Sequence, residues 1–258
     1  MKKSLTVVKV GGKIVEDPES LSQLLDRFSS IEGAKMLIHG GGRTATDIAA
    51  QMGLQTQMVN GRRITDANML RVVTMVYGGL VNKNIVAQIS DRGLKALGLT
   101  GADMSVIRSH RRPVTPEGID YGFVGDVDSV DADAVSLLIE GGVVPVVAPL
   151  TLGSGAQLLN TNADTVAGEV AKAMSRLYDV TLTFCFEKKG VLLDADDDES
   201  VIPQITEQSY ATLKEQGVVS GGMLPKLDNS FNALRGGVSR VVITRSDQIG
   251  LCGTTITL

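Results

Sequence analysis

The sequence predicts an α/β protein whose central sheet is mainly parallel and carries helices on both faces. Short apolar runs rich in β-branched residues alternate with helical patterns along the chain. One run, residues 143–148, is apolar throughout, as are strands buried inside a parallel sheet. Two glycine-rich turns each follow a strand and precede a helix. The 258 residues suit one domain, and no linker sequence divides them.

Strand–turn–helix units fill the first part of the chain. A strand ends at Gly11-Gly12, and a helix begins where Asp17 caps the first turn and Pro18 takes the first helical position. A second strand ends at a triple-glycine turn, residues 40–42. A later helical stretch contains Gly78-Gly79, which predicts a break or a close packing contact. The predicted strands cover 5–10 and 34–39, and the predicted helices start at 17 and cover 44–52 and 66–92.

The remaining sequence changes its pattern before the alternation resumes. Residues 105–130 contain short alternating segments with prolines and glycines, which predict hairpins or a flap. The acidic residues 194–199 predict a solvated loop. Helices are predicted over 131–140, 163–174, 207–216 and 223–234, and strands over 143–148, 157–160, 180–186, 240–244 and 254–257.

Composition and charge exclude several classes of protein. A hydrophobic fraction of 43% with 21% charged residues excludes intrinsic disorder and a membrane bundle. The net charge of −4 argues against a nucleic acid as the main partner. Cys185 and Cys252 cannot form a disulfide framework or a zinc site, and Cys185 is expected to be a small buried hydrophobe. The first residues lack the apolar run of a signal peptide, so a cytoplasmic protein is expected.

The two glycine turns indicate a phosphate site. In a parallel sheet both turns lie at the carboxyl edge, and glycine lets backbone N–H groups approach an anion. Lys9 ends the first strand, and Lys226 lies at the start of a helix after another glycine turn. A solvated surface position is the alternative for each lysine. Two lysines beside glycine turns suit phosphoryl transfer, in which the protein positions the reactants and offsets charge.

Polar side chains gather at two further places. Asn160, Asn162 and Asp164 crowd the start of a helix, and three are more than a cap requires. Arg62 and Arg63 lie in a predicted hairpin with their side chains on opposite faces. One of these arginines is expected at the surface, whereas the other is placed to form a bidentate pair with a substrate carboxylate.

Other motif interpretations compete with this one. The pattern Gly40-x-Gly42-x-x-Ala45 also fits the dinucleotide fingerprint, so a nicotinamide-dependent oxidoreductase is an alternative. The segment that follows, however, is a polar hairpin and not a strand ending in an acid. A Walker A loop and a G-x-S-x-G elbow are both absent from the sequence. The chain has only two histidines, and His39 is expected to be structural and to bond a neighbouring turn.

Five motifs occur in the order seen in the amino acid kinase family. They are Lys9-Val-Gly-Gly, His39-Gly-Gly-Gly, Asn60-Gly-Arg-Arg-Ile-Thr, Asn160-Thr-Asn-Ala-Asp and Gly222-Met-Leu-Pro-Lys226. The resemblance covers nearly the whole chain. Within the family, the chain most resembles the N-acetylglutamate kinases of arginine biosynthesis. It implies an open three-layer αβα sandwich over residues 1–258, with an acylglutamate-binding lobe over about 1–175 and an ATP-binding lobe over about 176–258.

The resemblance also implies a role for each motif. ATP would phosphorylate the side-chain carboxylate of an N-acylglutamate, with Mg²⁺ held mainly by the nucleotide phosphates and no metal site on the protein. Lys9 and Lys226 would stabilise the transition state, and Asp164 would hold both ammonium groups. The N–H groups of Gly12 and Gly42 would bind the transferring oxygens. The acylglutamate would contact Gly41, Gly42, Arg63, Asn160 and Asn162, and the nucleotide would contact Lys9, Gly11, Gly12, Glu187, Gly190, Val191, Val219, Ser220, Met223 and Lys226.

Some features depart from the family pattern. Glu187 stands where Asp is typical, and Pro225 directly precedes Lys226. No helix precedes the first strand; in the family that helix accompanies arginine-sensitive hexamers, so an arginine-insensitive homodimer is expected. N-acetylglutamate is the default acceptor, and N-succinylglutamate is the alternative because Arg62 and residues 111–112 offer cations for a second carboxylate. A ligand sensor without turnover is a further alternative.

Overall fold

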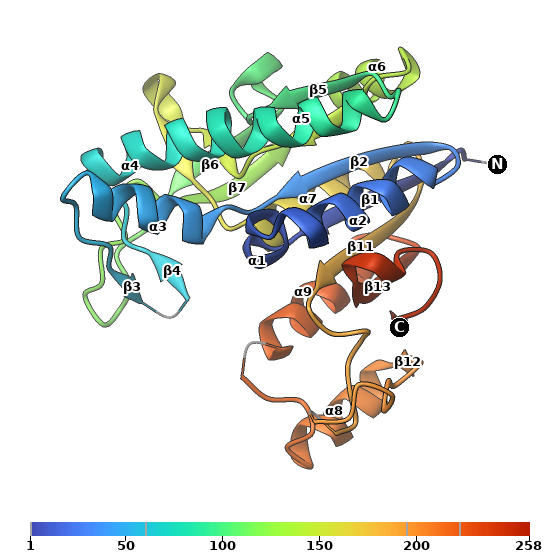
Figure 1. Cartoon of the computed structure of the whole chain (residues 1–258). Coiled ribbons are helices and arrows are strands. Elements are labelled where there is room, and N and C mark those ends of the chain that lie inside the picture. Colours follow the sequence, from blue (N-terminus) through green and yellow to red (C-terminus); the bar gives the residue numbers. More distant parts are fainter. Residues whose placement is uncertain (1, 60, 195, 222) are drawn as a thin grey trace.

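The main sheet brings together strands from both halves of the chain (Figure 1). The computed structural model describes residues 2–59, 61–194, 196–221 and 223–258. Over these residues eight strands pair in the order β12-β14-β13-β11-β1-β2-β8-β5, and only β13 and β14 pair antiparallel. The predicted mainly parallel sheet is therefore confirmed. The strands are β1 (Ser4–Val10), β2 (Ala34–His39), β5 (Ala96–Leu99), β8 (Val144–Val147), β11 (Asp179–Phe186), β12 (Gln204–Ile205), β13 (Arg240–Arg245) and β14 (Thr254–Ile256).

Alternate side chains of β1 enter two cores, one on each face of the sheet. Leu5 and Val7 join one core, whereas Val8 and Val10 join the other, because successive side chains of a strand point to opposite faces. Helices cover both cores, which confirms the αβα arrangement. The first core is covered by α6 (Ala132–Glu140), α7 (Ala163–Met174) and α9 (Met223–Arg235), and the second by α1 (Gly12–Glu16), α2 (Pro18–Ser30), α3 (Gly42–Gln51), α4 (Ala67–Val73) and α5 (Asn82–Asp91).

Helix α2 begins as its sequence predicts. The Asp17 side chain accepts hydrogen bonds from the N–H groups of Glu19 and Ser20, and Pro18 is the first helical residue. Pro18 fits there because an N–H at this position has no partner within the helix. The apolar side chains of α2 are buried against the sheet, namely Leu21, Leu24, Leu25 and Phe28.

The long helical stretch predicted over 66–92 runs through a π-helical segment instead of breaking. α4 passes into η1 (Thr74–Val81) and η1 into α5. A Cβ on Gly78 would lie 3.4 Å from Leu150 Cδ1 and 3.6 Å from Thr100 Cγ2, so this glycine permits a close contact. Among the residues that the structure describes, no helix is long and apolar enough to cross a membrane.

The predicted hairpin region, residues 105–130, supplies two strands of a second sheet, β6 and β7. Within the described residues this sheet has four strands in the order β10-β9-β6-β7, and β6 pairs antiparallel with β7. A separate hairpin pairs β3 (Met58–Val59) with β4 (Arg62–Arg63). The sequence analysis did not predict β5, β9 or β12, which are four residues long or shorter. The second sheet contains β6 (Ile107–Arg111), β7 (Gly125–Val130), β9 (Leu150–Leu152) and β10 (Leu158–Asn160).

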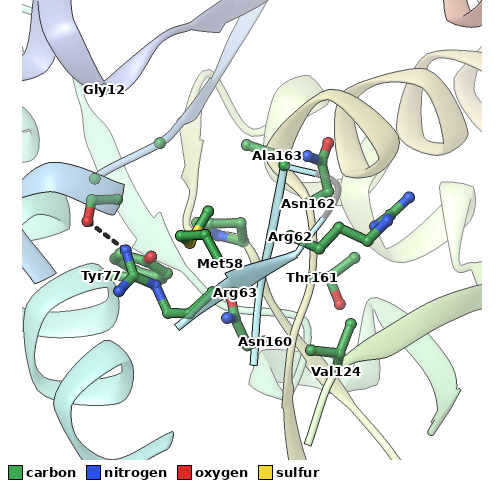
Figure 2. Close-up of a pocket in the computed structure, with 15 residues that line it drawn as sticks. Gly12, Met58, Arg62, Arg63, Tyr77, Val124, Asn160, Thr161, Asn162 and Ala163 are labelled. Carbon is green, nitrogen blue, oxygen red and sulfur yellow. Dashed lines mark hydrogen bonds between the residues drawn. The ribbon is translucent and has the colours of Figure 1, made fainter. Parts of the chain in front are cut away.

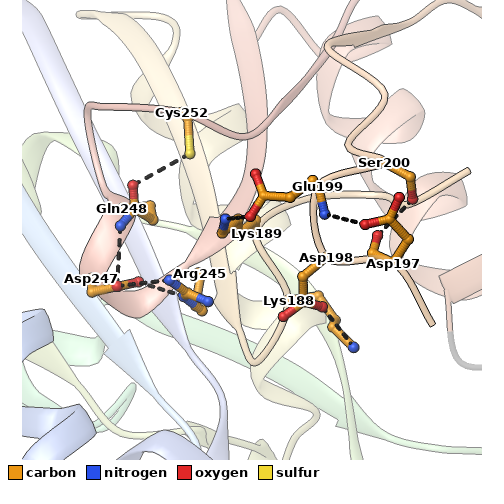
Figure 3. A network of polar contacts seen from close by, with 10 residues as sticks. All are labelled: Lys188, Lys189, Asp197, Asp198, Glu199, Ser200, Arg245, Asp247, Gln248 and Cys252. Atoms are coloured by element: carbon orange, nitrogen blue, oxygen red, sulfur yellow. Dashed lines mark hydrogen bonds and ion pairs between the residues drawn. The ribbon is translucent and has the colours of Figure 1, made fainter. Parts of the chain in front are cut away.

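Ion pairs hold the loop that follows β11 (Figure 3). Lys188 Nζ lies 2.8 Å from Asp198 Oδ1, and Lys189 pairs with Glu199. These pairs tie the two lysines to acidic residues on the returning arm of the loop. Residues 194 and 196–199 are mostly exposed, as predicted for a solvated loop, and residue 195 lies outside the described residues. The Lys188 and Asp198 side chains are each 46% exposed and that of Glu199 is 80% exposed, so solvent screens both pairs and each contributes little to stability. The chain then enters α8 (Glu207–Glu215).

Candidate active site

The glycine turns after β1 and β2 meet at the carboxyl edge of the sheet. Val10 and His39, the last residues of these strands, pair in register. A Cβ on Gly12 would lie 3.5 Å from the backbone N of Gly42 and 3.6 Å from that of Gly41. Within the part of the chain that the structure describes, the N–H groups of these three glycines donate no hydrogen bond. Converging unpaired amides are suited to an anion, and binding of an anion at these turns stays a prediction.

A cavity of about 190 Å³ opens on the triple-glycine turn (Figure 2). The hairpin residues Arg62 and Arg63 line it, together with Tyr77 from η1 and residues 160–163 at the start of α7. Gly12 forms part of its wall. The cavity therefore combines the glycine amides with two arginines and with polar groups from a distant part of the sequence.

Arg63 is buried in this cavity with part of its guanidinium unpaired. The side chain is 7% exposed. Its Nη2 donates to the carbonyl oxygen of Gly42 at 2.6 Å and to Thr46 Oγ1 at 2.9 Å. Nη1 is buried and has no hydrogen-bond partner among the described residues. A buried cation with a free N–H needs an acceptor, and a carboxylate satisfies both the charge and the donor.

Asn160 and Asn162 enter the same cavity with different partners. Asn160 Nδ2 donates to Thr65 Oγ1 at 3.0 Å. Asn162 is the N-cap of α7, because its Oδ1 accepts from the N–H groups of Asp164 and Thr165 at 2.9 and 3.1 Å. The capping role given to one residue of this cluster thus falls to Asn162, and a contact of its amide Nδ2 with a ligand stays a prediction.

Lys9 and Asp164 form an ion pair at the base of the site. Lys9 Nζ lies 2.6 Å from Asp164 Oδ1, and both side chains are largely buried. Lys9 continues the row of Leu5 and Val7 on β1, so it points to the face of the sheet that α7 covers. Asp164 is at the start of α7, which explains why the two groups meet.

A second cavity, of about 320 Å³, joins Lys9 to Lys226. Both lysines line it, with Gly11 and Gly12 on one side and the end of β11 on the other. Lys226 projects from the first turn of α9, and its Nζ lies 5.8 Å from the centre of the Phe186 ring. Pro225 fits the same turn, where a missing N–H costs no helical hydrogen bond.

Asp164 holds only one of the two ammonium groups in this structure. Within the described residues no ion pair of 4.0 Å or less joins Lys226 to Asp164. The structure thus pairs Asp164 with Lys9, and the expectation that Asp164 also holds Lys226 stays a prediction. The physical reason is placement, since Asp164 and Lys9 share the β1–α7 contact, whereas Lys226 lies on α9 beside Phe186.

Lys13 and Glu187 form an ion pair in the wall of the second cavity. Their Nζ and Oε1 atoms are 2.7 Å apart. Partial burial raises the pKa of Glu187, but the hydrogen bond and charge of Lys13 outweigh it and the net pKa is lowered. Cys185 also lines this cavity; it is 2% exposed, which confirms the small buried hydrophobe expected, and burial raises the pKa of its thiol to about 12.

The other predicted nucleotide contacts do not line the cavity of Lys9 and Lys226. A Cβ on Gly190 would lie 2.7 Å from Thr254 Oγ1, so this glycine packs against β14. Val191 and Val219 are buried, Ser220 is exposed, and Met223 packs against the first core. Their part in nucleotide binding stays a prediction. Asn60 and Gly222, which belong to two of the motifs, lie outside the described residues.

Tyr77 and Lys13 are among the lining residues that the sequence analysis missed. Tyr77 comes from the middle of a helical stretch, where an aromatic residue normally indicates core. Burial raises the pKa of Tyr77, and the nearby Arg63 lowers it in part. Lys13 carried a usable signal, because it directly follows the first glycine turn as a second cation.

The donor set of the second cavity fits phosphate. Ammonium groups and backbone N–H groups face it, and both are donors suited to phosphate oxygens. Among the described residues no group of three or more His, Cys, Asp or Glu side chains is placed to hold a metal ion.

Known proteins share this architecture and much of this sequence. The chain is 63% identical over 255 residues to an acetylglutamate kinase from Bacteroides fragilis, covering 99% of this chain and 97% of that protein. It is 61% identical over 249 residues to an acetylglutamate kinase from Phocaeicola vulgatus, covering 96% of each. A solved structure of a Streptococcus mutans protein superposes with a TM-score of 0.78 at 26% identity and covers 98% of both chains. The model of the Amino acid kinase family matches residues 4–245. The chain belongs to the amino acid kinase family.

Proposed function

We propose that this protein transfers the γ-phosphoryl group of ATP to the side-chain carboxylate of N-acetyl-L-glutamate, a step of arginine biosynthesis. The products are N-acetyl-L-glutamyl 5-phosphate and ADP. Relatives at 60–63% identity over nearly the whole chain are acetylglutamate kinases. One observation of the structure carries the proposal: the cavity with the unpaired arginine and the cavity with the two lysines share Gly12.

The acceptor substrate occupies the cavity of about 190 Å³. The free Nη1 of Arg63 donates to the α-carboxylate, and Asn160 and Asn162 bind the polar groups of the acylglutamate. The turn of Gly41 and Gly42 then receives the side-chain carboxylate. This arrangement points the reacting oxygen at the second cavity.

The second cavity holds the phosphates of ATP. One oxygen of the acceptor carboxylate attacks the γ-phosphorus while the bond from that phosphorus to the bridging oxygen of ADP breaks. No base is required, because a carboxylate with a pKa near 4.3 is ionised at neutral pH. Lys9 and Lys226 offset the charge on the transferring group and on the leaving ADP, and the N–H groups of Gly12 and Gly42 bind its oxygens. Asp164 orients Lys9.

The two lobes fit this division of labour. β1, β2, β8 and β5 form one half of the sheet and β11 to β14 the other, and the lysine cavity lies where the halves meet. We place the acylglutamate on the lobe of residues 1–175 and ATP on that of residues 176–258. Mg²⁺ would neutralise phosphate charge when bound. Consumption of ATP supports a cytoplasmic location for the reaction.

The protein is further proposed to be an arginine-insensitive homodimer. Exposed apolar side chains support an interface at the β5 edge of the sheet, since Leu97 on β5 is 40% exposed and Leu137 on the neighbouring α6 is 68% exposed. Light scattering should give twice the chain mass of 27.2 kDa. A hexamer, or inhibition by arginine, would contradict this assignment.

The experiment that tests the function is a coupled assay of ADP release. N-acetyl-L-glutamate should give saturable, ATP-dependent turnover, and hydroxylamine should trap the acyl phosphate. N-succinyl-L-glutamate is the comparison substrate, since the names of the relatives favour the acetyl group. A higher kcat/KM for the succinyl compound would overturn the choice of acyl group. Binding of NADH without turnover of ATP would restore the oxidoreductase alternative, and binding of ATP without turnover would indicate a sensor.

A further inference from the structure

A buried histidine lies directly behind the glycine turn of the active site. His39 is the last residue of β2, and its side chain has no exposed surface. Its Nδ1 lies 2.7 Å from the carbonyl oxygen of Gly40. Its Nε2 lies 3.1 Å from Nδ2 of Asn82, the first residue of α5. The imidazole thus connects the triple-glycine turn to a helix that begins 43 residues later.

The partners of the ring fix its tautomer. A carbonyl oxygen only accepts hydrogen bonds, so the proton must be on Nδ1 and is donated to Gly40. Nε2 is then an acceptor, and it receives an N–H of Asn82. The second N–H of the same amide donates to the carbonyl oxygen of Val146 at 2.9 Å. A flipped Asn82 amide would set its oxygen against two acceptors, so only this orientation gives both Nε2 and the Val146 carbonyl a donor; Asn82 Oδ1 itself is buried without a hydrogen-bond partner among the described residues.

A glycine on the neighbouring strand leaves room for the Asn82 side chain. A Cβ on Gly98 of β5 would lie 1.8 Å from Asn82 Oδ1. No side chain fits at this position, so the glycine leaves the space that the amide occupies. The chain of contacts therefore runs from Gly98 through Asn82 and His39 to the carbonyl of Gly40.

The peptide between Gly40 and Gly41 carries this constraint into the site. A trans peptide is planar, and its C=O and N–H point in opposite directions. When His39 holds the carbonyl on the buried side, the N–H of Gly41 must point the other way, towards the cavity that the glycine turn lines. We expect the same turn to direct the next N–H, that of Gly42, towards this cavity as well.

We propose that His39 is a positioning residue for phosphoryl transfer, and that Asn82 selects the tautomer it needs. His39 fixes the peptide that presents the amides of Gly41 and Gly42 to the reacting carboxylate and the transferring group. This role rests on the function proposed above. His39 touches neither reactant and transfers no proton.

The buried ring stays neutral throughout the working pH range. Burial lowers the pKa of His39 to about 4, although the hydrogen bond to Gly40 opposes the change. The ring keeps its proton on Nδ1 and gains no second proton in this range. The pH profile of kcat should therefore show no ionisation of His39 between about pH 6 and 9.

Two substitutions separate positioning from mere packing. In His39→Asn the amide nitrogen occupies the place of Nδ1 and still donates to Gly40, whereas in His39→Gln the amide reaches only the place of Nε2. We expect His39→Asn to keep kcat within about 3-fold and His39→Gln to lower it by at least ~10-fold, towards the ~10²-fold or greater loss seen when such a donor is removed. The KM for ATP should stay unchanged in both, and thermal melts establish that both variants fold.

Asn82→Asp provides a second readout. A carboxylate accepts from Nε2, so it forces a proton onto that nitrogen and raises the pKa of the ring. A new ionisation should then appear in the pH profile of kcat, with a loss of activity where the ring carries one proton on Nε2. Equal kcat values for the two His39 variants, or a flat profile for Asn82→Asp, would overturn the proposal.

The tautomer itself is tested without any activity. Nitrogen NMR of the unliganded wild-type protein should show one imidazole with a protonated Nδ1 and an unprotonated Nε2 at pH 7, and the chain has only two histidines to assign. A protonated Nε2 on His39 would disprove the positioning role. A protonated Nδ1 in a protein that phosphorylates no acylglutamate would instead reject the proposed function and leave the tautomer assignment standing.

Discussion

The unpaired N–H of Arg63 is a direct residue-scale indication of an anionic ligand. Arg63 lies on β4, and the same hairpin presents Arg62 to the same cavity. The two differ in environment, since burial and the neighbouring Arg112 lower the pKa of Arg62, whereas Arg63 is held by Gly42 and Thr46. A matched pair of substitutions therefore distinguishes them.

Arg63→Ala should raise the KM for N-acetyl-L-glutamate by roughly 10- to 100-fold, because a hydrogen-bonded charge pair contributes about 1.5–3 kcal/mol. The KM for ATP should change little. Initial rates at varied concentrations of each substrate provide both constants, and Arg62→Ala serves as the control with a smaller effect. A selective rise in the KM for ATP would contradict the placement of the acceptor substrate.

The two lysines of the second cavity make a kinetic prediction. Lys9→Ala and Lys226→Ala should each lower kcat by ~10²-fold or more, the scale expected when a preorganised charge-stabilising donor is removed. Lys3→Ala is the control, since Lys3 is a strongly exposed lysine near the other end of β1. Single-turnover measurements separate chemistry from product release. Near-normal rates in both cavity variants would show that these lysines take no part in phosphoryl transfer.

At this scale the sequence located charged groups better than it located their partners. Lys9 stood out because a charge at the end of an apolar strand is costly without a partner. Arg63 stood out because it lies in a polar hairpin, and Asp164 because it belongs to a polar cluster larger than a helix cap requires. The pairing of Asp164 with Lys9 alone depends on which strand lies beneath α7, and no local pattern contains that information. Tyr77 could not be predicted either, because its place in the cavity depends on contacts between segments that are far apart in the sequence.

At the scale of elements, β5 shows why some strands were missed. Its four residues include Gly98, and glycine lowers the strand signal. The glycine is required by a partner on another element, because its missing side chain leaves room for Asn82. Longer strands such as β1, β2 and β11 were found because each buries side chains on both faces.

Gly98→Ala should destabilise the protein by about 1–3 kcal/mol, the range typical of overpacking, because its Cβ would overlap Asn82 Oδ1. Gly79→Ala is the matched control. A Cβ on Gly79 meets nothing within 4 Å, and alanine is favoured over glycine in a helical segment, so this variant should be neutral or slightly more stable. Urea unfolding at pH 7 measures both. Equal stabilities for the two variants would contradict the close approach at Gly98.

For the whole molecule, the buried His39 links stability to pH. Its pKa is about 4 in the folded protein and near the ordinary 6.5 when unfolded. The unfolded chain therefore binds more protons between these values, and the free energy of unfolding falls as the pH drops from about 6.5 towards 4. The full effect is on the order of 3 kcal/mol, at 1.36 kcal/mol for each pKa unit.

His39→Asn removes the titration of His39 and leaves the other titrating groups in place. Unfolding free energies at pH 7 and pH 5 should differ more in the wild type than in the variant, by about 2 kcal/mol. Urea titrations at both pH values measure the difference. The same pH dependence in both proteins would show that His39 is not held neutral by burial.

The overall architecture could be predicted better than the site or the individual short elements. Alternation of strands and helices gave the parallel sheet, and the apolar run at 143–148 became the buried strand β8. The order of strands was not accessible, because β11 pairs with β1 across 175 residues of sequence. That pairing creates the cleft in which Lys9 and Lys226 face the same cavity.

Gly12 is the shared wall of two cavities, and it has no side chain to keep their contents apart. A single molecule that joins an acylglutamate to a nucleotide through a phosphate bridge would fill both at once. Such a bisubstrate ligand enters as one body, so its second half binds at a high effective concentration. Its affinity should exceed that of either substrate by orders of magnitude, and any side chain at position 12 would block the bridge before it blocked either half.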